Sequence, residues 1–431
     1  MKNRYIYLTF LLISSFAKSQ IVNIPDVNFK NALLNHSPNI DLNNDNEIQI
    51  SEASSYNNPI NVTNYNYDFS SMISNFTGIE AFINMTKFIA NNQSLYMGGF
   101  NFSFNPMITV IEIRGCSATQ LDISNNNNLI KLDIEGNQIS GLDFSNLLNL
   151  EELSVKNTNF TTIDLSQNTN LKKLSIFATD ITSIDLSNNL ALEDFSSGGA
   201  PLSFLNLANN INLKKLEIQG ATYSSIDLSQ NINLEHIACY GATVLNFDLS
   251  NNINLTYFGC GNNLFTTLDL SNNINLQSFV SQGNTFLQTI NLKNGNNSNI
   301  SNFEVLNHPN LTKVCVDDVS YAINNFTNID NSNVFNICNE LSIADSQYLG
   351  DVKIYPNPLL DNTLNIEVNS SIEVKELFFI DLSGRSIKID SNNINQANNQ
   401  IVINSELISS DFFFLKVVTN EGVFVKKIFK K

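Results

Sequence analysis

A four-residue unit, apolar-Asp-apolar-Ser, begins at every twenty-first position through the middle of this chain of 431 residues. A single unit of this length cannot bury its own apolar face, whereas stacked units share one continuous core. The 21-residue interval therefore predicts a solenoid of stacked coils without long helices. The copies begin at Leu121, Leu142, Ile163, Ile184, Leu205, Ile226, Phe247 and Leu268, with a shorter copy at Ile290.

A second apolar pattern, Leu-x-x-Leu-x-Leu-x-x-Asn-x-Leu, lies between these units. Its clearest copy has Leu129, Leu132 and Ile134, followed by Asn137 and Ile139. This spacing, with Asn or Cys at the ninth position, resembles the leucine-rich-repeat family over about residues 76–316. The resemblance implies the fold and leaves the ligand open. Five coils depart from the Asn/Cys rule, at Thr158, Thr179, Ala200, Ala221 and Ala242.

Each coil carries two stretches in which apolar residues alternate with polar ones. Alternation along a strand places successive side chains on opposite faces. We therefore expect a mainly β solenoid with two short parallel sheets, one on each side, joined by Asn-rich turns such as residues 250–255. Nine coils at roughly 4.8 Å each would form a rod of about 40 Å.

An Asp- and Asn-rich segment at residues 41–52 precedes the repeats. It resembles an EF-hand or dockerin-type calcium loop, with oxygen-bearing side chains at its first, third, fifth and twelfth positions. The resemblance implies Ca²⁺ bound by the side chains of Asp41, Asn43, Asp45 and Glu52 and by the backbone carbonyl of Glu47. Asn46 stands where glycine is usual, and Gln49 could act through water. The alternative is an acidic, Asn-rich loop that binds no metal.

Residues 20–75 should form a small N-terminal cap that contains this loop, because the open end of a solenoid core needs a cover. We expect one helix over residues 27–34 and the beginning of another within residues 51–56. The solenoid with its C-terminal cap is placed at residues 76–340.

The chain has five cysteines. Cys315 and Cys338 bracket the end of the repeats, and we expect a disulfide between them, which an exported protein can form. Cys239 and Cys260 are one repeat interval apart and so occupy equivalent positions in adjacent coils. They could be bridged, but buried thiols are the favoured interpretation. Cys116 occupies the Asn/Cys position of its own coil.

The composition changes near residue 345, where alternating strand patterns replace the repeats. Residues 345–431 resemble the C-terminal sorting domain of type IX secretion substrates of the Bacteroidota. The resemblance rests on Tyr-Pro-Asn-Pro at 355–358, Ser-Gly-Arg at 383–385, Phe-x-Leu-Lys-Val at 413–417 and the basic residues after Gly422. It implies export through that machinery, followed by removal of the domain and attachment at the outer surface or release. The alternative is a small β-sandwich without a sorting role.

Residues 1–19 have the features of a secretory signal peptide: a positive start, a short apolar run and small residues before the cleavage point. The alternative is a membrane anchor. The formal net charge of −17 makes nucleic acid an unsuitable partner, because binding to phosphates requires a basic surface. We therefore expect a secreted or cell-surface protein.

No motif for catalysis stands out, and we expect no enzyme activity. A column of Asp residues, which includes Asp143 and Asp164, recurs once in each coil. Neighbouring carboxylates about 4.8 Å apart would repel one another. Either cations bind along the column, or each Asp accepts N–H groups of its own turn, and the second interpretation is favoured.

The other side of the coils carries variable outward residues, among them the aromatic residues Phe177, His236, Tyr240 and Tyr257. These four could form a contact surface, or they could pack singly on neighbouring strands. The first hypothesis is a non-catalytic binding or adhesion protein that presents the repeats to a protein or glycan. The alternatives are a glycan-acting hydrolase and a purely structural surface spacer.

Overall fold

The computed structural model describes residues 20–338, except 67, 94–97, 223–224 and 245–246, and beyond them a set of strands and short segments. The expected signal peptide at 1–19 lies outside the described residues. The chain divides into two compact units, 1–338 and 339–431. Described in the second unit are 352–355, 357, 359, 363–368, 373–380, 386–389, 394–397, 400–404, 412–419 and 423–429.

The first unit begins with a small helical cap. Helix α1 spans Val27–Leu34, as predicted, and is capped by Asp26, whose carboxylate accepts the Phe29 N–H. Helix α2 spans Ile50–Ser55, and the short 3-10 helices η1 and η2 span Phe69–Ser71 and Ile79–Ala81. The buried side of α1 carries Phe29 and Leu33. These side chains join the core of the repeats, so the cap closes the open end of the solenoid.

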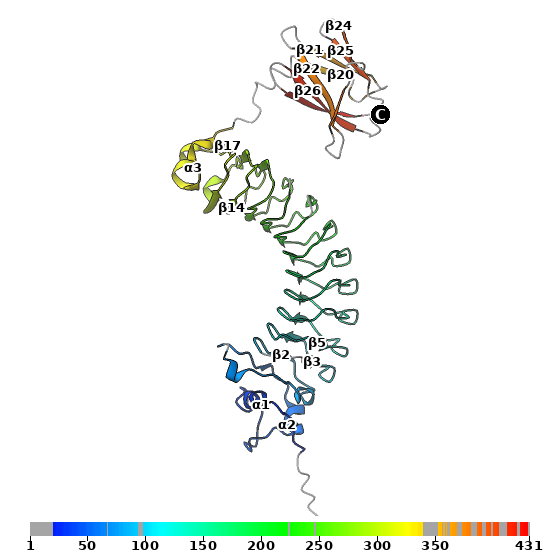
Figure 1. Ribbon diagram of the computed structural model, residues 1–431, viewed down its shortest axis with the longest axis vertical. Helices are drawn as coiled ribbons and strands as arrows, with labels where there is room; N and C mark the ends of the chain where they lie inside the picture. The colour runs from blue at the N-terminus through cyan, green and yellow to red at the C-terminus, as the bar shows by residue number, and fades with distance from the viewer. Residues whose placement is uncertain are drawn as a thin grey trace, which may run out of the picture. The chain divides into compact units, whose positions relative to one another are not determined.

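One parallel sheet of 13 strands runs along the first unit. The residues that pair in adjacent central strands are one repeat interval apart, as in Lys131↔Glu152↔Lys173, which confirms the predicted register. The stack of coils is curved, and this sheet lies on its inner, concave side (Figure 1). Its strands are β1 Ile60–Asn61, β2 Lys87–Ile89, β4 Val110–Glu112, β6 Lys131–Asp133, β7 Glu152–Ser154, β8 Lys173–Ser175, β9 Asp194–Ser196, β10 Lys215–Glu217, β11 His236–Ala238, β12 Tyr257–Gly259, β14 Ser278–Gln282, β16 Asn302–Leu306 and β18 Asn328–Ile329.

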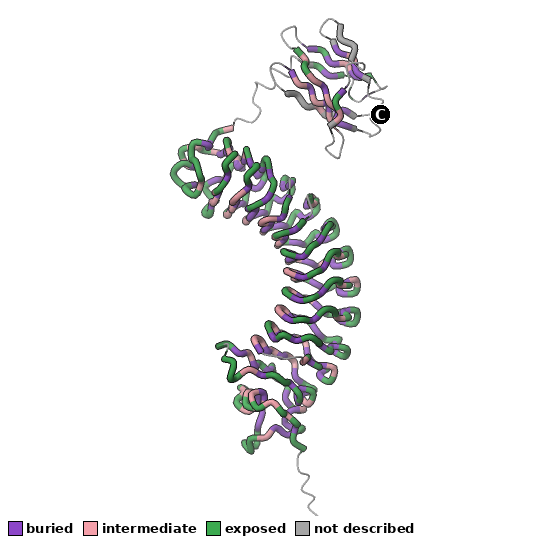
Figure 2. Tube along the Cα trace, viewed as in Figure 1, coloured by how far each residue is buried: buried purple, intermediate pink, exposed green. Residues whose placement is uncertain are grey.

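The middle residue of each central three-residue strand points into the solenoid. Leu132, Leu153, Leu174, Phe195 and Leu216 are all buried on consecutive strands. Buried and exposed segments alternate around every coil (Figure 2). The apolar positions thus form one core that runs from the cap to the last coil. The mainly β solenoid predicted from the repeat interval is confirmed.

The second predicted sheet is present only near the two ends of the first unit. It consists of a pair, β3 Gly99–Asn101 with β5 Gln120–Asp122, and of four strands, β13 Thr267–Asp269, β15 Thr289–Asn291, β17 Lys313–Cys315 and β19 Phe335–Asn336. Among the described residues between 123 and 266, the outer side has no strand. The expected second sheet is thus formed by only part of the coils. On the convex side of a curved stack neighbouring coils lie farther apart than on the concave side, which disfavours a ladder with its spacing of about 4.8 Å.

Buried Asn side chains connect the coils on this outer side instead. The Asn231 amide donates to the carbonyls of Leu207 at 3.0 Å and Asn210 at 2.9 Å in the preceding coil. The amides therefore bond to backbone carbonyls and not to one another. Leu147 interrupts the column, and Asn168 donates to its carbonyl at 2.9 Å. Equivalent donors are Asn126, Asn168, Asn189, Asn210, Asn252 and Asn273.

The last coils close with helix α3 Val319–Asn325 and the 3-10 helices η3 Asn297–Asn299 and η4 Ser332–Val334. Cys315 on β17 forms a disulfide with Cys338, with Cα atoms 5.0 Å apart. Cys116, Cys239 and Cys260 are buried free thiols, so the possible bridge between Cys239 and Cys260 is not formed. The disulfide ties the end of the first unit to its outer sheet.

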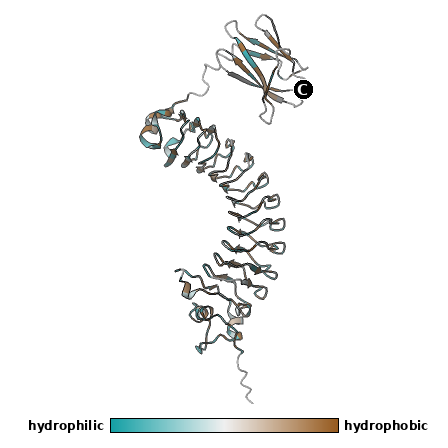
Figure 3. Cartoon of the chain, viewed as in Figure 1, coloured by the Kyte–Doolittle hydropathy of each residue, from teal (hydrophilic) through white to brown (hydrophobic). Residues whose placement is uncertain are grey.

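The second unit contains two antiparallel sheets, ordered β20-β21-β25-β24 and β23-β22-β26-β27, which share one core. Apolar and polar residues are interspersed along these strands (Figure 3). The predicted C-terminal β-sandwich is thus present, although Pro356, Pro358 and the Ser-Gly-Arg turn lie outside the described residues. The strands are β20 Val352–Tyr355, β21 Thr363–Val368, β22 Val374–Ile380, β23 Ser386–Lys388, β24 Ile394–Ala397, β25 Gln400–Asn404, β26 Phe412–Thr419 and β27 Val423–Phe429.

No helix in the described part of the chain combines the length and apolarity needed to cross a membrane.

Candidate binding surface

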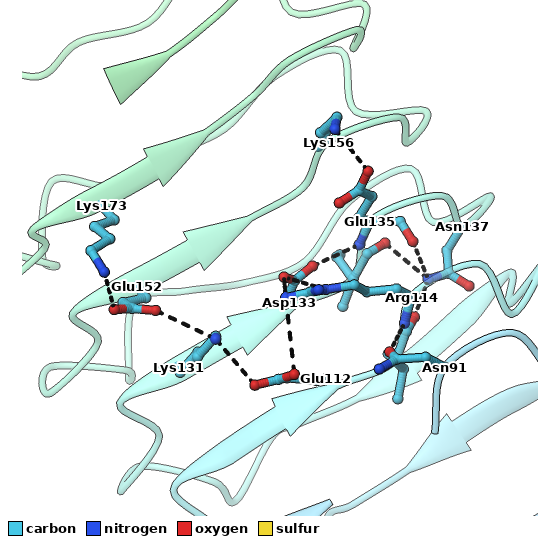
Figure 4. A network of polar contacts seen from close by, with 12 residues as sticks. Asn91, Glu112, Arg114, Lys131, Asp133, Glu135, Asn137, Glu152, Lys156 and Lys173 are labelled. Carbon is cyan, nitrogen blue, oxygen red and sulfur yellow. Dashed lines mark hydrogen bonds and ion pairs between the residues drawn. The ribbon is translucent and has the colours of Figure 1, made fainter. Parts of the chain in front are cut away.

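The first and third residues of each central inner strand point out of the concave sheet. The first position alternates in charge from strand to strand through Lys131, Glu152, Lys173, Asp194 and Lys215. The Lys173 ammonium lies 2.7 Å from the Glu152 carboxylate, and the Lys131 ammonium lies 3.5 Å from it. Figure 4 shows Lys131 between Glu112 and Glu152. The alternation places an opposite charge beside each charged side chain.

These ion pairs cancel the charge of the concave face. The hydrogen bond from Lys173 lowers the pKa of the Glu152 carboxyl. Lys215 lies 2.9 Å from Glu217 and Lys156 lies 2.9 Å from Glu135. Exposed pairs of this kind contribute little to stability, on the order of 0–1 kcal/mol each. Their main consequence is a locally neutral surface on an acidic protein.

A hollow of about 370 Å³ lies in the middle of this face. Its floor is formed by Ser154, Ser175 and Ser196, the third residues of β7, β8 and β9. Larger side chains, including Lys173 and Phe177, rise around it. Three consecutive coils have a small residue with a hydroxyl at this position, whereas the coils on either side have Asp133 and Glu217. These serines were not predicted as site residues, although their regular spacing at an outward position is visible in the sequence.

Phe177 borders the hollow and lies over the next coil. A β-carbon added at Gly198 would lie 2.6 Å from the Phe177 Cε2 atom, so the ring occupies the space above this glycine. Gly198 follows Phe177 by one repeat interval and holds the equivalent position of the next coil. The Lys156 ammonium lies 5.5 Å from the centre of the ring. A flat aromatic side chain is therefore held against the sheet beside the serine floor.

The other predicted aromatic residues form one cluster farther along the same face. The rings of His236 and Tyr257 stack with their centres 4.2 Å apart and an angle of 5° between them. The hydroxyls of Tyr240 and Tyr257 are 2.6 Å apart. A β-carbon at Gly259 would lie 2.3 Å from the Tyr240 hydroxyl oxygen, and one at Gly261 would lie 3.2 Å from Tyr240 Cδ1. Tyr240 thus lies flat across the two glycines of the next coil.

The structure brings His236, Tyr240 and Tyr257 together and places Phe177 apart from them. All four are half-buried and pack on neighbouring strands, so they are less exposed than a free contact surface would be. Burial lowers the pKa of His236 and raises the pKa of Tyr240, which keeps both side chains uncharged at neutral pH. The aromatic part of the concave face is therefore neutral, like the ion-paired part.

The residues predicted to bind calcium lie in the loop between α1 and α2. Asp41 accepts the Asn46 N–H at 3.0 Å, and Glu52 accepts the Gln49 N–H at 2.9 Å. Asn46 has a φ of 65°, the conformation expected for the residue that replaces glycine. The second oxygen of Asp45 accepts the side-chain amides of Asn43 at 3.0 Å and Gln49 at 2.8 Å. The loop is closed by its own hydrogen bonds around these side chains.

One oxygen of this loop is left without a partner. Asp41 is 6% exposed, and its buried Oδ1 atom accepts no hydrogen bond. A buried carboxylate oxygen without a donor is unfavourable, and a cation would satisfy it. In the described part of the chain, however, no three His, Cys, Asp or Glu side chains gather as a metal centre. A cation at Asp41 would require the amides of Asn43 and Gln49 to turn away from Asp45.

The Asp column on the outer side follows the favoured interpretation. In each member the carboxylate accepts the N–H of the Ser two residues later, at distances from 2.8 Å for Asp143 to 3.1 Å for Asp122. This hydrogen bond holds the pKa of Asp164 and Asp185 below the ordinary value. The hydrogen bonds within each turn therefore explain why Asp recurs at this position.

Comparisons with known proteins agree with the two-part architecture. Residues 353–431 match the secretion system C-terminal sorting domain family. The protein is thus a mainly β solenoid followed by a sorting domain, and it is secreted or displayed at the cell surface. No curated protein sequence matches the chain.

Solved structures similar to this chain include two from Listeria monocytogenes. The functional domain of InlJ, described as including a cysteine ladder, is 17% identical, with a TM-score of 0.39, 89% of this chain covered and 93% of that chain. The internalin InlF is 17% identical, with a TM-score of 0.49 and coverages of 74% and 96%. A leucine-rich-repeat protein from Leptospira interrogans is 14% identical, with a TM-score of 0.45 and coverages of 58% and 72%.

Proposed function

We propose that this protein is a non-catalytic binding or adhesion protein that holds a macromolecular partner, a protein or a glycan, on its concave face. The observation that carries the proposal is the hollow over β7, β8 and β9, which is lined by serines, paired charges and Phe177. Concave surfaces with a few polar groups and an aromatic side chain are common ligand sites. The sorting domain at 353–431 delivers this surface to the outside of the cell.

Adhesion of cells that display the protein tests this function. Ser175→Trp fills the middle of the hollow with a bulky side chain, and because Ser175 points outward the coil should still fold. We expect cells carrying this variant to attach to surfaces, to polysaccharide and to other cells no better than cells that lack the gene. Ser187→Trp, on the exposed outer side, is the matched control and should retain adhesion. Equal adhesion by both variants would contradict a concave binding site.

Export through the type IX machinery is part of the same proposal. Deletion of residues 339–431 should leave the solenoid inside the cell envelope, because the sorting domain would be missing. Fractionation of the producing bacterium would locate the protein. Unchanged surface display of the shortened chain would disprove the sorting role.

We further propose that Ca²⁺ binds the cap loop at Asp41, with Asn43, Asp45, Glu47 and Glu52 as the other ligands. The support is the buried, unpartnered Asp41 oxygen together with the ligand spacing. Ca²⁺ at about one hundred times its Kd should stabilise the folded state by about 2.7 kcal/mol. Asp41→Asn should abolish this effect in thermal unfolding, whereas Asp68→Asn, elsewhere in the cap, should retain it. If the parent chain unfolds at the same temperature in Ca²⁺ as in EDTA, the site is ruled out.

A further inference from the structure

The same arrangement, an aromatic ring over a glycine of the next coil, occurs twice on the concave face. Phe177 lies over Gly198, and Tyr240 lies over Gly261, in each case the residue one repeat interval later. The two aromatic residues are three coils apart and occupy equivalent positions. Strands about 4.8 Å apart place them about 14 Å from each other along the sheet.

Glycine determines how each ring lies. Because Gly198 and Gly259 have no β-carbon, the rings of Phe177 and Tyr240 can lie directly on the backbone of the next coil. One face of each ring is then covered by the sheet. Because Phe177 and Tyr240 are only partly buried, the accessible area of each ring is on the side that faces away from the sheet. Two flat apolar platforms thus lie along the concave face.

Groups that can form hydrogen bonds, but form none within the protein, lie beside the first platform. In the described part of the chain, the hydroxyls of Ser154, Ser175 and Ser196 make no hydrogen bond within the protein. The Asp194 carboxylate accepts none either, and its nearest cation, the Lys215 ammonium, is 3.9 Å away. Burial raises the pKa of Asp194. Hydroxyls can donate and accept, and a carboxylate can accept, so these groups suit a ligand rich in hydroxyls.

The charge of the hollow disfavours an ionic polymer. Its lining contains five cationic and four acidic side chains, although the whole chain has a net charge of −17. The cationic side chains are paired, including Arg114 with Asp133 at 2.6 Å. A charged ligand would have to break such pairs, whereas a neutral ligand would not.

The position of the hollow also disfavours a peptide bound by strand addition. That mode requires the free edge of a sheet. The hollow lies over β7, β8 and β9, in the interior of a sheet whose edge strands are β1 and β18. The backbone of the interior strands is already paired on both sides.

Resting on the proposed binding function, we infer that the concave face binds a neutral polysaccharide that extends along the coils, with sugar rings on Phe177 and Tyr240 and hydroxyls bonded to the serine floor and Asp194. The C–H face of a sugar ring is apolar and matches an aromatic platform. Its hydroxyls match the unpartnered polar groups.

Affinity electrophoresis and calorimetry of the chain from residue 20 to 431 test this inference. The probes are a β-1,4-glucan, a β-1,3-glucan, an α-mannan and the anionic polymer polygalacturonate. We expect binding to at least one neutral probe and none to polygalacturonate. Phe177→Ala and Tyr240→Ala should each raise Kd about tenfold, and the double variant about a hundredfold.

Two variants control for structural damage. Tyr240→Phe removes the hydroxyl that meets Tyr257 and keeps the ring, so it should restore most of the affinity that Tyr240→Ala loses. Phe204→Ala removes a ring that is 69% exposed and lies outside the concave sheet, so it should also leave Kd unchanged. For oligosaccharides too short to reach both rings, the double variant should not raise Kd beyond the effect of a single substitution.

Failure to bind any neutral probe, or an unchanged Kd in the double alanine variant, would overturn the inference. If the probes fail while adhesion remains sensitive to Ser175→Trp, the concave face binds a different class of partner and the proposed function survives. If adhesion is also insensitive to Ser175→Trp, both are wrong.

Discussion

On the inner side of the solenoid, backbone hydrogen bonds join neighbouring coils in a sheet of 13 strands, whereas on the outer side buried Asn side chains replace most of the ladder. Both sides come from the same repeat. On the inner side neighbouring coils stay at strand spacing, whereas on the outer side the curvature increases the distance between them. Where the backbone cannot reach the next coil, a side-chain amide spans the additional distance. The difference shows that one repeat can use two kinds of linkage, and each can be tested separately.

The largest effect is expected where the outer side does form a sheet. Replacing both Cys315 and Cys338 with Ala removes a link across 23 residues and should cost about 3 kcal/mol. In hydrogen exchange, the outer amides of Leu292 and Val316, which bond to Cys315 and Asn336, should lose protection first. Reduction of the disulfide in the parent chain should have the same effect as the double substitution. Equal loss of protection along the inner sheet would contradict the separation of the two sides.

A smaller effect is expected from the Asn column. Asn231→Ala removes two buried hydrogen bonds to the preceding coil and should cost about 2 kcal/mol in denaturant unfolding. Asn233→Ala is the matched control, because Asn233 is exposed and makes one bond to the Ile211 carbonyl at 2.9 Å. It should cost less than about 0.5 kcal/mol. Similar losses for the two variants would mean that the buried amides do not connect the outer side.

The smallest effect concerns the Asp turns, and it depends on pH. The Ser166 backbone N–H and hydroxyl hold the pKa of Asp164 below its ordinary value of 3.8. A lowered carboxyl pKa stabilises the folded state above pH 3.8, and this contribution is lost as the pH falls through the folded pKa. Asp143→Asn, Asp164→Asn and Asp185→Asn together should therefore reduce the loss of stability between about pH 4 and about pH 2.

The chain contains a natural control for that experiment. Asn206 replaces Asp in one coil, and its side-chain oxygen accepts the Ala208 N–H at 3.0 Å. The triple Asn variant should therefore keep its turns and match the parent chain near neutral pH. Urea unfolding at several pH values measures both effects. An unchanged acid profile would show that these turns do not contribute to the pH dependence.

Much of the architecture could be predicted because the repeat is strict. Leu132, Leu153 and Leu174 recur at the repeat interval, so the core and its register followed from spacing. The N-terminal helix followed from residues 27–34, and the structure joins Cys315 to Cys338. The extent of the outer sheet could not be predicted, because curvature arises from the packing of many coils and not from one repeat.

The candidate binding surface was only partly predictable. The large outward residues Phe177, His236, Tyr240 and Tyr257 could be predicted, but the serines and glycines that shape the surface around them could not. Small residues carry no chemical signal of their own. Their importance appeared when the third positions of β7, β8 and β9 were found side by side beneath longer neighbours.

The sequence by itself determined the coil: its period, its inward apolar positions and its Asp turns, because each depends on residues within one or two repeats. Only the tertiary structure decided which side forms a continuous sheet, where the hollow lies and which rings rest on glycine. Those features depend on distances between coils, which are set by the packing of the whole stack.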